Sequence, residues 1–164
     1  KVINLSVDGV TADIRTWGGE GSQSGYSIIT TTDGGLIVAG ISNSNSQNSN
    51  FVTKYDSASN IIWSKSIEIE GNFTQVSGVA QTVDVVTGYT QSILTNAMSM
   101  FATKISNTGS YAWTKTWSSS SQDIGYDIVA NPDGGFTIFG ISNEPTYNIW
   151  ETFNAKFNSV SNLV

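Results

Sequence analysis

The sequence predicts an all-β protein, and three observations support this: short alternating apolar runs, glycine-rich turns between them, and a repeat of about fifty residues. Apolar residues that alternate over short runs have the period of half-buried strands rather than of helices. The repeated residues stand fifty or one hundred positions apart: Asp33-Gly34-Gly35 and Asp133-Gly134-Gly135, Trp63 and Trp113, Lys65 and Lys115. A chain that repeats at this spacing is predicted to be an array of small modules.

Each module is expected to contain four strands. In the first module we place them at about 25–31, 36–42, 51–56 and 61–67, with a flexible surface loop over the polar run 42–50, SNSNSQNSN. The double glycines lie between the first two strands, where glycine supplies the positive φ that a tight hairpin requires. The later strands are expected to start near Val76, Asp84, Met100 and Tyr111, and near Gly125, Phe136 and Thr152.

Units of this length with four strands are typical of β-propeller blades, each too small to bury both of its faces alone. We therefore expect three four-stranded propeller-like blades, at 17–66, 67–116 and 117–164, in a single array over residues 1–164. Residues 1–16 align with the last two strands of a blade, and the third blade stops where its last strand would begin. Incomplete blades are thus predicted at both termini.

These motifs resemble those of extracellular β-propeller repeat proteins, whose units carry Asp-Gly-Gly, an apolar strand, a glycine, a lysine-bearing strand and a tryptophan. The segment Tyr55 to Trp63, YDSASNIIW, is also similar to the tryptophan-docking turn of quinoprotein propellers. The second unit departs from the pattern, because Val83-Asp84-Val85 stands in place of the double glycine. The resemblance implies a secreted or cell-surface protein, and members of these groups serve as adhesins, scaffolds or enzymes.

Composition argues against several classes of function. The net charge of −6 and the absence of a basic stripe disfavour nucleic acid as a partner. The chain has no histidine and no cysteine, which removes the usual zinc ligands, disulfides and histidine-dependent nucleophiles. No run approaches the roughly 20 apolar residues of a membrane span, and residues 1–10 lack the apolar core of a signal peptide. We expect a soluble, processed protein.

Incomplete blades predict self-association, because bare sheet edges pair with other chains. Three explanations stay open: two chains closing a six-bladed ring, chains exchanging terminal strands into a filament, or a sequence that is a piece of a longer array. We expect a noncatalytic extracellular structural protein whose partner is itself. The alternative is a carbohydrate- or protein-binding propeller domain of a larger adhesin, and a quinone-dependent or carbohydrate-active enzyme is a third reading.

Few residues stand out as candidates for binding. Tyr147 and Trp150 lie in a predicted loop of the third unit and have no aromatic counterpart in the other units, which makes them a candidate contact surface. Asn4 and Asn72 begin the two N-glycosylation sequons, and Asn72 is expected in a connection between strands. Trp17 and the other repeated tryptophans are expected to pack between blades.

We predict no catalytic residue, no cofactor and no metal site. Glu68 and Glu70 are expected on one face of a strand, and Asp123 and Asp127 beside the first strand of the third unit, but neither pair recurs in the other units. We interpret all of these as solvated surface charges. Asp33 and Asp133 of the two Asp-Gly-Gly motifs are interpreted as turn residues.

Overall fold

The computed structural model describes residues 2–5, 11–15, 21–44, 47–70, 72–80, 85–118, 122–144, 146–147 and 149–164. Within these ranges the chain is all-β, as predicted, and no helix occurs that could cross a membrane. The strands are β1 Val2–Leu5, β2 Thr11–Arg15, β3 Ser22–Thr30, β4 Leu36–Ser44, β5 Gln47–Tyr55, β6 Ile61–Ile67, β7 Asn72–Ala80, β8 Val85–Ser92, β9 Met98–Ile105, β10 Tyr111–Trp117, β11 Gln122–Ala130, β12 Phe136–Glu144 and β13 Ile149–Phe157.

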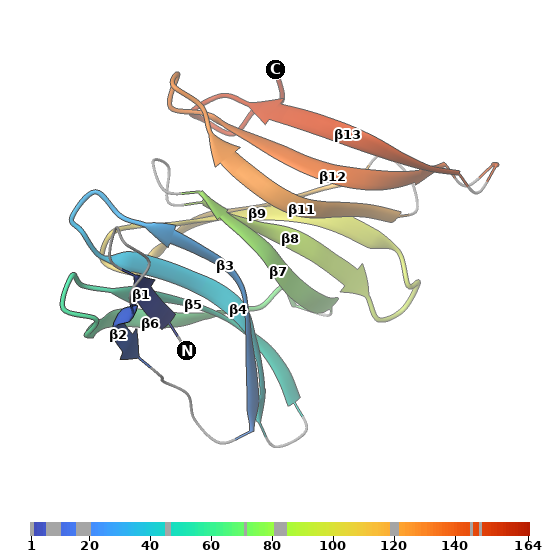
Figure 1. Cartoon of the computed structure of the whole chain (residues 1–164). Coiled ribbons are helices and arrows are strands. Elements are labelled where there is room, and N and C mark those ends of the chain that lie inside the picture. Colours follow the sequence, from blue (N-terminus) through green and yellow to red (C-terminus); the bar gives the residue numbers. More distant parts are fainter. Residues whose placement is uncertain are drawn as a thin grey trace.

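The strands form three consecutive antiparallel groups, called here the first unit (β3 to β6), the second unit (β7 to β10) and the third unit (β11 to β13). Within each unit every strand pairs with the next one along the chain. The predicted sets of four strands in the first and second units, and of three in the third, are confirmed. The three units follow one another through the molecule, from the blue strands to the red ones (Figure 1).

The strands β1 and β2 form a separate antiparallel pair, the initial hairpin. Its register shifts between Asn4 and Leu5, and the register of β5 with β6 shifts between Lys54 and Tyr55. An irregularity at the same place separates Tyr111 from its next paired neighbour in β10. The described residues of the initial hairpin, 2–5 and 11–15, therefore pair in the same register as the last two strands of a unit.

One backbone contact joins the second and third units into a continuous sheet, which the sequence did not predict. Gln122 at the start of β11 pairs in parallel with Met98 at the start of β9. This contact is possible because β10 pairs with β9 only as far as Met100, which lies opposite Trp117. The first residues of β9 thus extend past β10 and are available to a second neighbour.

The prediction of a flexible loop over residues 42–50 is wrong for 42–44 and 47–50, which belong to β4 and β5, while residues 45 and 46 lie outside the described chain. The ladder of β4 and β5 continues through this polar run, with Asn43 opposite Asn48 and Ser44 opposite Gln47. Asn and Ser have low strand propensity, but the apolar part of the hairpin sets the register and each further backbone pair only extends it. Tertiary context therefore overrides composition here.

Each unit has a bulge at the same place in its first strand. The register shifts between Gly25 and Ser27 in β3, between Val76 and Gly78 in β7, and between Gly125 and Asp127 in β11. An extra residue reverses the face on which all later side chains of the strand lie. Sequence alternation alone therefore assigns the wrong face to half of each of these strands.

The core lies between the units, and the second unit buries both of its faces. Alternate residues of its strands contact opposite neighbours: Val86 and Phe101 pack against the first unit, whereas Val85 and Met100 pack against the third. We call the face of a unit toward the preceding unit its rear face, and the other its forward face. The middle position of β7 to β9 is visible in Figure 1.

Replacement of Phe101 by Ala tests this arrangement. Phe101 is fully buried, so the variant should lose about 3–5 kcal/mol of unfolding free energy in urea denaturation. The control is Phe139→Ala on the open face of the third unit, where Phe139 is 43% exposed and a much smaller loss is expected. Equal losses in the two variants would contradict the assignment of the core.

Candidate functional site

The repeated Asp and Lys of a unit form an ion pair that fastens the first hairpin to the third strand. Lys54 Nζ lies 2.9 Å from Asp33 Oδ2, and Lys156 Nζ lies 3.1 Å from Asp133 Oδ2. Asp33 and Asp133 each accept the backbone N–H two residues on, at 3.2 Å and 2.9 Å. Their interpretation as turn residues is confirmed, and the ion pair explains why Lys repeats with them.

The glycines of these turns have the backbone conformation that was predicted. Gly34 and Gly134 both have φ of 80°. The Thr31 hydroxyl, then Lys54 and the Gly35 N–H, hold the pKa of Asp33 well below its ordinary value of 3.8. The pKa of Asp133 is lowered chiefly by the backbone N–H of its turn and then by Lys156.

The fourth strand of the first unit docks on a turn of the second unit. Trp63 Nε1 donates a hydrogen bond to the Asn107 carbonyl at 3.0 Å. The indole lies against Gly109, where an added Cβ would come within 2.9 Å of Trp63 Cγ and where φ is +80°. A larger residue at this position would push the tryptophan away. Tyr111 OH, in return, donates to the Ser66 carbonyl.

The fourth strand of the second unit also docks on the third unit, but through a lysine instead of a tryptophan. Lys115 Nζ donates to the carbonyls of Val160 and Ser161, at 3.4 Å and 3.2 Å, in the turn that follows β13. Trp113 stacks with Phe136 at 6.1 Å, and the ring of Trp117 lies 4.5 Å from that of Phe157. The predicted packing of Trp63, Trp113 and Trp117 between units is thus confirmed, whereas Trp17 lies outside the described residues.

The outer edge of β13 has almost no partner within the described chain. Only its last residues are covered, by the bridge of Phe157 with Leu163 and the hydrogen bond from Val164 N to the Lys156 carbonyl at 2.9 Å. In the other units a fourth strand pairs along this whole edge. The stretch from Ile149 to Ala155 therefore presents unused backbone groups.

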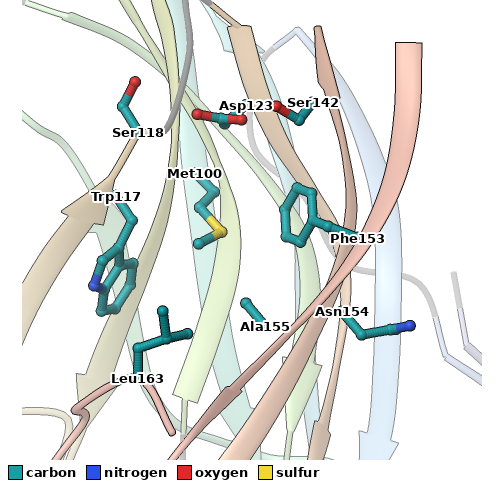
Figure 2. Close-up of a pocket in the computed structure, with 9 residues that line it drawn as sticks. All are labelled: Met100, Trp117, Ser118, Asp123, Ser142, Phe153, Asn154, Ala155 and Leu163. Atoms are coloured by element: carbon teal, nitrogen blue, oxygen red, sulfur yellow. The ribbon is translucent and has the colours of Figure 1, made fainter. Parts of the chain in front are cut away.

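A cleft of about 370 Å³ opens beside this edge, between the second and third units. Figure 2 shows Trp117 and Leu163 on one side of it, Met100 and Phe153 across its middle, and Asp123 with Ser142 at its upper end. Its lining is mostly apolar. A pocket between the first and second units, lined by Ile37, Val52 and Trp63 among others, has only about 10 Å³.

A buried amide closes the corresponding place between the first and second units. Asn50 Nδ2 donates to the carbonyls of Ile67 and Thr74, at 3.3 Å and 2.6 Å, and its Oδ1 accepts Val76 N–H at 3.0 Å. Its counterpart fifty residues on is Met100, which cannot make these bonds and instead lines the cleft. The cleft thus marks the place where the second unit lacks the clamp and the third unit lacks a fourth strand.

The forward face of the third unit is more polar than the faces that pack between units. Ile37 and Val52 of the first unit lie in the core, but their counterparts are Thr137 and Asn154. Only scattered apolar side chains, such as Phe139 and Val129, remain exposed on this face. Contact with water is therefore less unfavourable for this face than for the apolar lining of the cleft.

Tyr147 and Trp150, the predicted contact surface, lie at the end of the hairpin formed by β12 and β13. Trp150 belongs to β13, opposite Asn143, rather than to a loop, and Tyr147 precedes that strand. Both side chains are exposed, Tyr147 by 74% and Trp150 by 46%. They stay candidates for contact with another molecule.

The sequon residues differ in how far the structure describes them. Asn4 belongs to β1, and its side chain lies outside the described residues. Asn72 is the first residue of β7, at the end of the predicted connection, and its amide donates to the Glu70 carbonyl at 2.9 Å. It is half-buried, while Thr74 of the same sequon is buried.

The carboxylate pairs do not form paired sites. Glu68 and Glu70 follow the end of β6 instead of lying on a strand, so that prediction is wrong, although both are exposed. Asp123 and Asp127 both belong to β11, but the bulge between them places them on opposite faces. Asp123 is buried beside the cleft, so its interpretation as a solvated charge is also wrong. The described residues contain no group of acidic side chains that could hold a metal ion.

A tyrosine cluster was missed in the sequence. Tyr89 OH donates to Gln75 Oε1 at 3.1 Å, and burial raises the pKa of Tyr89, with smaller contributions from Tyr26 and Tyr126. These tyrosines come from three different units. The repeated dipeptide Gly-Tyr, at 25–26 and 125–126, was the available signal, and in both copies the tyrosine is the extra residue of the bulge.

Comparison with known proteins adds no relative. No protein-family model matches the chain, and no curated protein matches it either.

Replacement of Asp33 by Asn tests the turn ion pair. Because the folded-state pKa of Asp33 is depressed, its stabilising contribution is present above about pH 4 and is lost as pH falls below that value. The variant should therefore melt at a lower temperature than the native chain at pH 7, and the difference should narrow in acid. Melting temperatures measured from neutral pH to strongly acidic pH check this, and parallel curves would refute it.

Proposed function

We propose that this chain is a noncatalytic extracellular structural protein that associates with itself when a strand of a second copy completes its third unit. The single observation that carries the proposal is the combination of the open edge of β13 with the cleft beside it. The fold supplies every other unit with a fourth strand at this place.

A propeller-like arrangement of the units is part of the proposal. The first strand of the second unit, β7, lies in contact with β3 and with β11, and an added Cβ on Gly78 of β7 would come within 3.0 Å of Asp127 Cα in β11. Antiparallel units whose first strands meet, with their later strands farther out, are typical of propeller blades around an axis. Each unit then contacts the next through its faces.

Strand addition suits this edge for two physical reasons. A strand laid along β13 would satisfy backbone N–H and C=O groups that otherwise bond only to water. Its side chains would also cover the apolar residues that line the cleft, among them Met100 and Phe153, and remove them from water. The mixed polarity of the forward face favours the edge over that face as the main contact.

The partner is a second copy, and the contact joins different surfaces of the two chains. Such a heterologous contact closes into a ring where its rotation allows and otherwise continues as a filament. Sedimentation distinguishes the two outcomes, because a ring has one fixed mass and a filament grows with concentration.

Sedimentation velocity over a concentration series tests the proposal. The native chain should form species heavier than 17.5 kDa as concentration rises. Phe153→Lys, which puts a charge in the cleft, should weaken association about tenfold or more, since an unpaired charge is costly to desolvate. Val129→Lys, which puts the same charge on the exposed forward face of β11, away from the cleft and the open edge, is the matched control and should associate normally.

A second measurement covers the case in which Phe153→Lys fails to fold. Hydrogen exchange on the native chain should show protection of the β13 amides that increases with concentration, with little change in β3. A chain that remains monomeric throughout the series, with no gain of protection in β13, would rule out self-association.

Carbohydrate binding is a second candidate function, favoured by the exposure of Tyr147 and Trp150 on one hairpin. Aromatic rings stack on the apolar faces of sugars. Replacement of both residues by Ala should abolish binding on a glycan array, whereas replacement of both by Phe should retain most of it. Binding that survives the Ala double variant would exclude this surface.

A further inference from the structure

We propose that the strand which completes the third unit is β2 of a second copy, with Asp13 to Arg15 bound along β13 in the register that they keep with β1 in their own chain. Thr11 cannot follow this register, because Leu163 of the acceptor already pairs with Phe157. This inference rests on the proposed function and names the partner segment. It is argued from register, from side-chain pairs and from charge.

The register of β2 matches that of a fourth strand. In the second unit Lys115 pairs with Ala102 and Trp113 pairs with Lys104. In the initial hairpin Arg15, fifty or one hundred residues before the repeated lysines, pairs with Val2, and Asp13 pairs with Asn4. Transfer of this pairing to the third unit places Asp13 opposite Lys156, Ile14 opposite Ala155 and Arg15 opposite Asn154.

The pair at the centre of this register distinguishes β2 from the other fourth strands. In the first unit the hydroxyls of Thr53 and Ser64 are hydrogen-bonded at 2.8 Å. In the second unit the hydroxyls of Thr103 and Thr114 are bonded at 3.0 Å. Directly opposite side chains of antiparallel strands share one face and interact, so each hydroxyl meets another hydroxyl.

The third unit has an apolar residue at this position. Ala155 replaces the threonine, and it lies in the core toward the second unit, beside the cleft. Ser64 and Thr114 are exposed, so a hydroxyl opposite Ala155 would stay in water and add no apolar contact. The initial hairpin pairs Ile3 with Ile14, so β2 carries an isoleucine here. Ile14 beside Ala155 would extend the apolar lining of the cleft.

Charge at the neighbouring pair also favours β2. The repeated lysine of the third strand stands opposite Trp63 in the first unit and Trp113 in the second. In β2 the tryptophan is replaced by Asp13. The Lys156 side chain is 50% exposed, against 10% for Lys54, so it can reach a second carboxylate besides Asp133. Opposite charges across a strand pair stabilise it.

The contact has to form between chains. Figure 1 shows the initial hairpin at the end of the molecule remote from β13. Donation of β2 therefore exchanges its pairing with β1 for pairing with β13 of another copy, which is strand swapping between identical chains. The exchange gives Asn154 and Ala155 of the open edge a backbone partner and places Ile14 at the cleft beside Ala155.

Cysteine cross-linking tests the register directly, because the chain has no cysteine of its own. Two single variants, Ile14→Cys and Ala155→Cys, are mixed under mild oxidation, one of them isotopically labelled. Opposite residues of antiparallel strands have Cα atoms close enough for a disulfide. The mixed disulfide should form, and mass spectrometry of the linked peptides should identify it. The control mixes Ile14→Cys with Asn154→Cys, whose thiol lies on the other face of β13.

The outcomes separate this inference from the proposed function. A yield of mixed disulfide about tenfold above the control supports donation of β2 in this register. Association by sedimentation together with a yield no higher than the control overturns donation of β2 and leaves self-assembly intact. If neither the variants nor the native chain associate, both donation of β2 and self-association are overturned.

Discussion

The structure depends on one constraint: a strand presents its side chains alternately to two faces, and a small sheet can bury only what its neighbours cover. The second unit meets this constraint fully, because Val86 and Phe101 on one face and Val85 and Met100 on the other all lie in the two cores. The first unit covers one of these faces and the third unit covers the other. The hydrogen bond from Trp63 to the Asn107 carbonyl holds the first unit in place against the second.

The same constraint explains why the third unit differs from its neighbours. Its rear face is apolar and packed, since it covers the second unit, whereas its forward face carries Thr137 and Asn154 in place of Ile37 and Val52. Its edge is adapted less completely. β13 carries the exposed charges of Glu151 and Lys156 but contains neither a proline nor a bulge, which are other devices that keep an exposed edge from pairing.

Much of the fold could be predicted from the sequence, because strand alternation, the fifty-residue spacing and the Asp-Gly-Gly turns are all local signals. The extension of β4 and β5 through residues 42–50 could not, since it depends on a register set elsewhere in the hairpin. Ser59 and Ser161, with φ of 65° and 62°, occupy turn positions where glycine would be expected, and Gly109 is the only glycine of the three.

The candidate site was less predictable than the fold. An open edge followed from the alignment of the units, but the cleft depends on Met100 standing where Asn50 forms a clamp, and an apolar residue gives no sign of a missing bond. The bulge in β11 was equally hard to predict from the sequence. Its extra residue places Asp123 and Asp127 on opposite faces of the strand. Tyr147 and Trp150 were found because their aromatic rings break the repeat.

The direction in which the units dock also bears on how such a chain could have grown. Two of these contacts run from one unit to the next in the same sense, from Trp63 to Asn107 and from Lys115 to Ser161. A duplicated gene segment encoding one unit would copy its forward face and its rear face together. Recombination could therefore lengthen or shorten the array without inventing a new interface, and the number of units would be free to vary between descendants of a common ancestor.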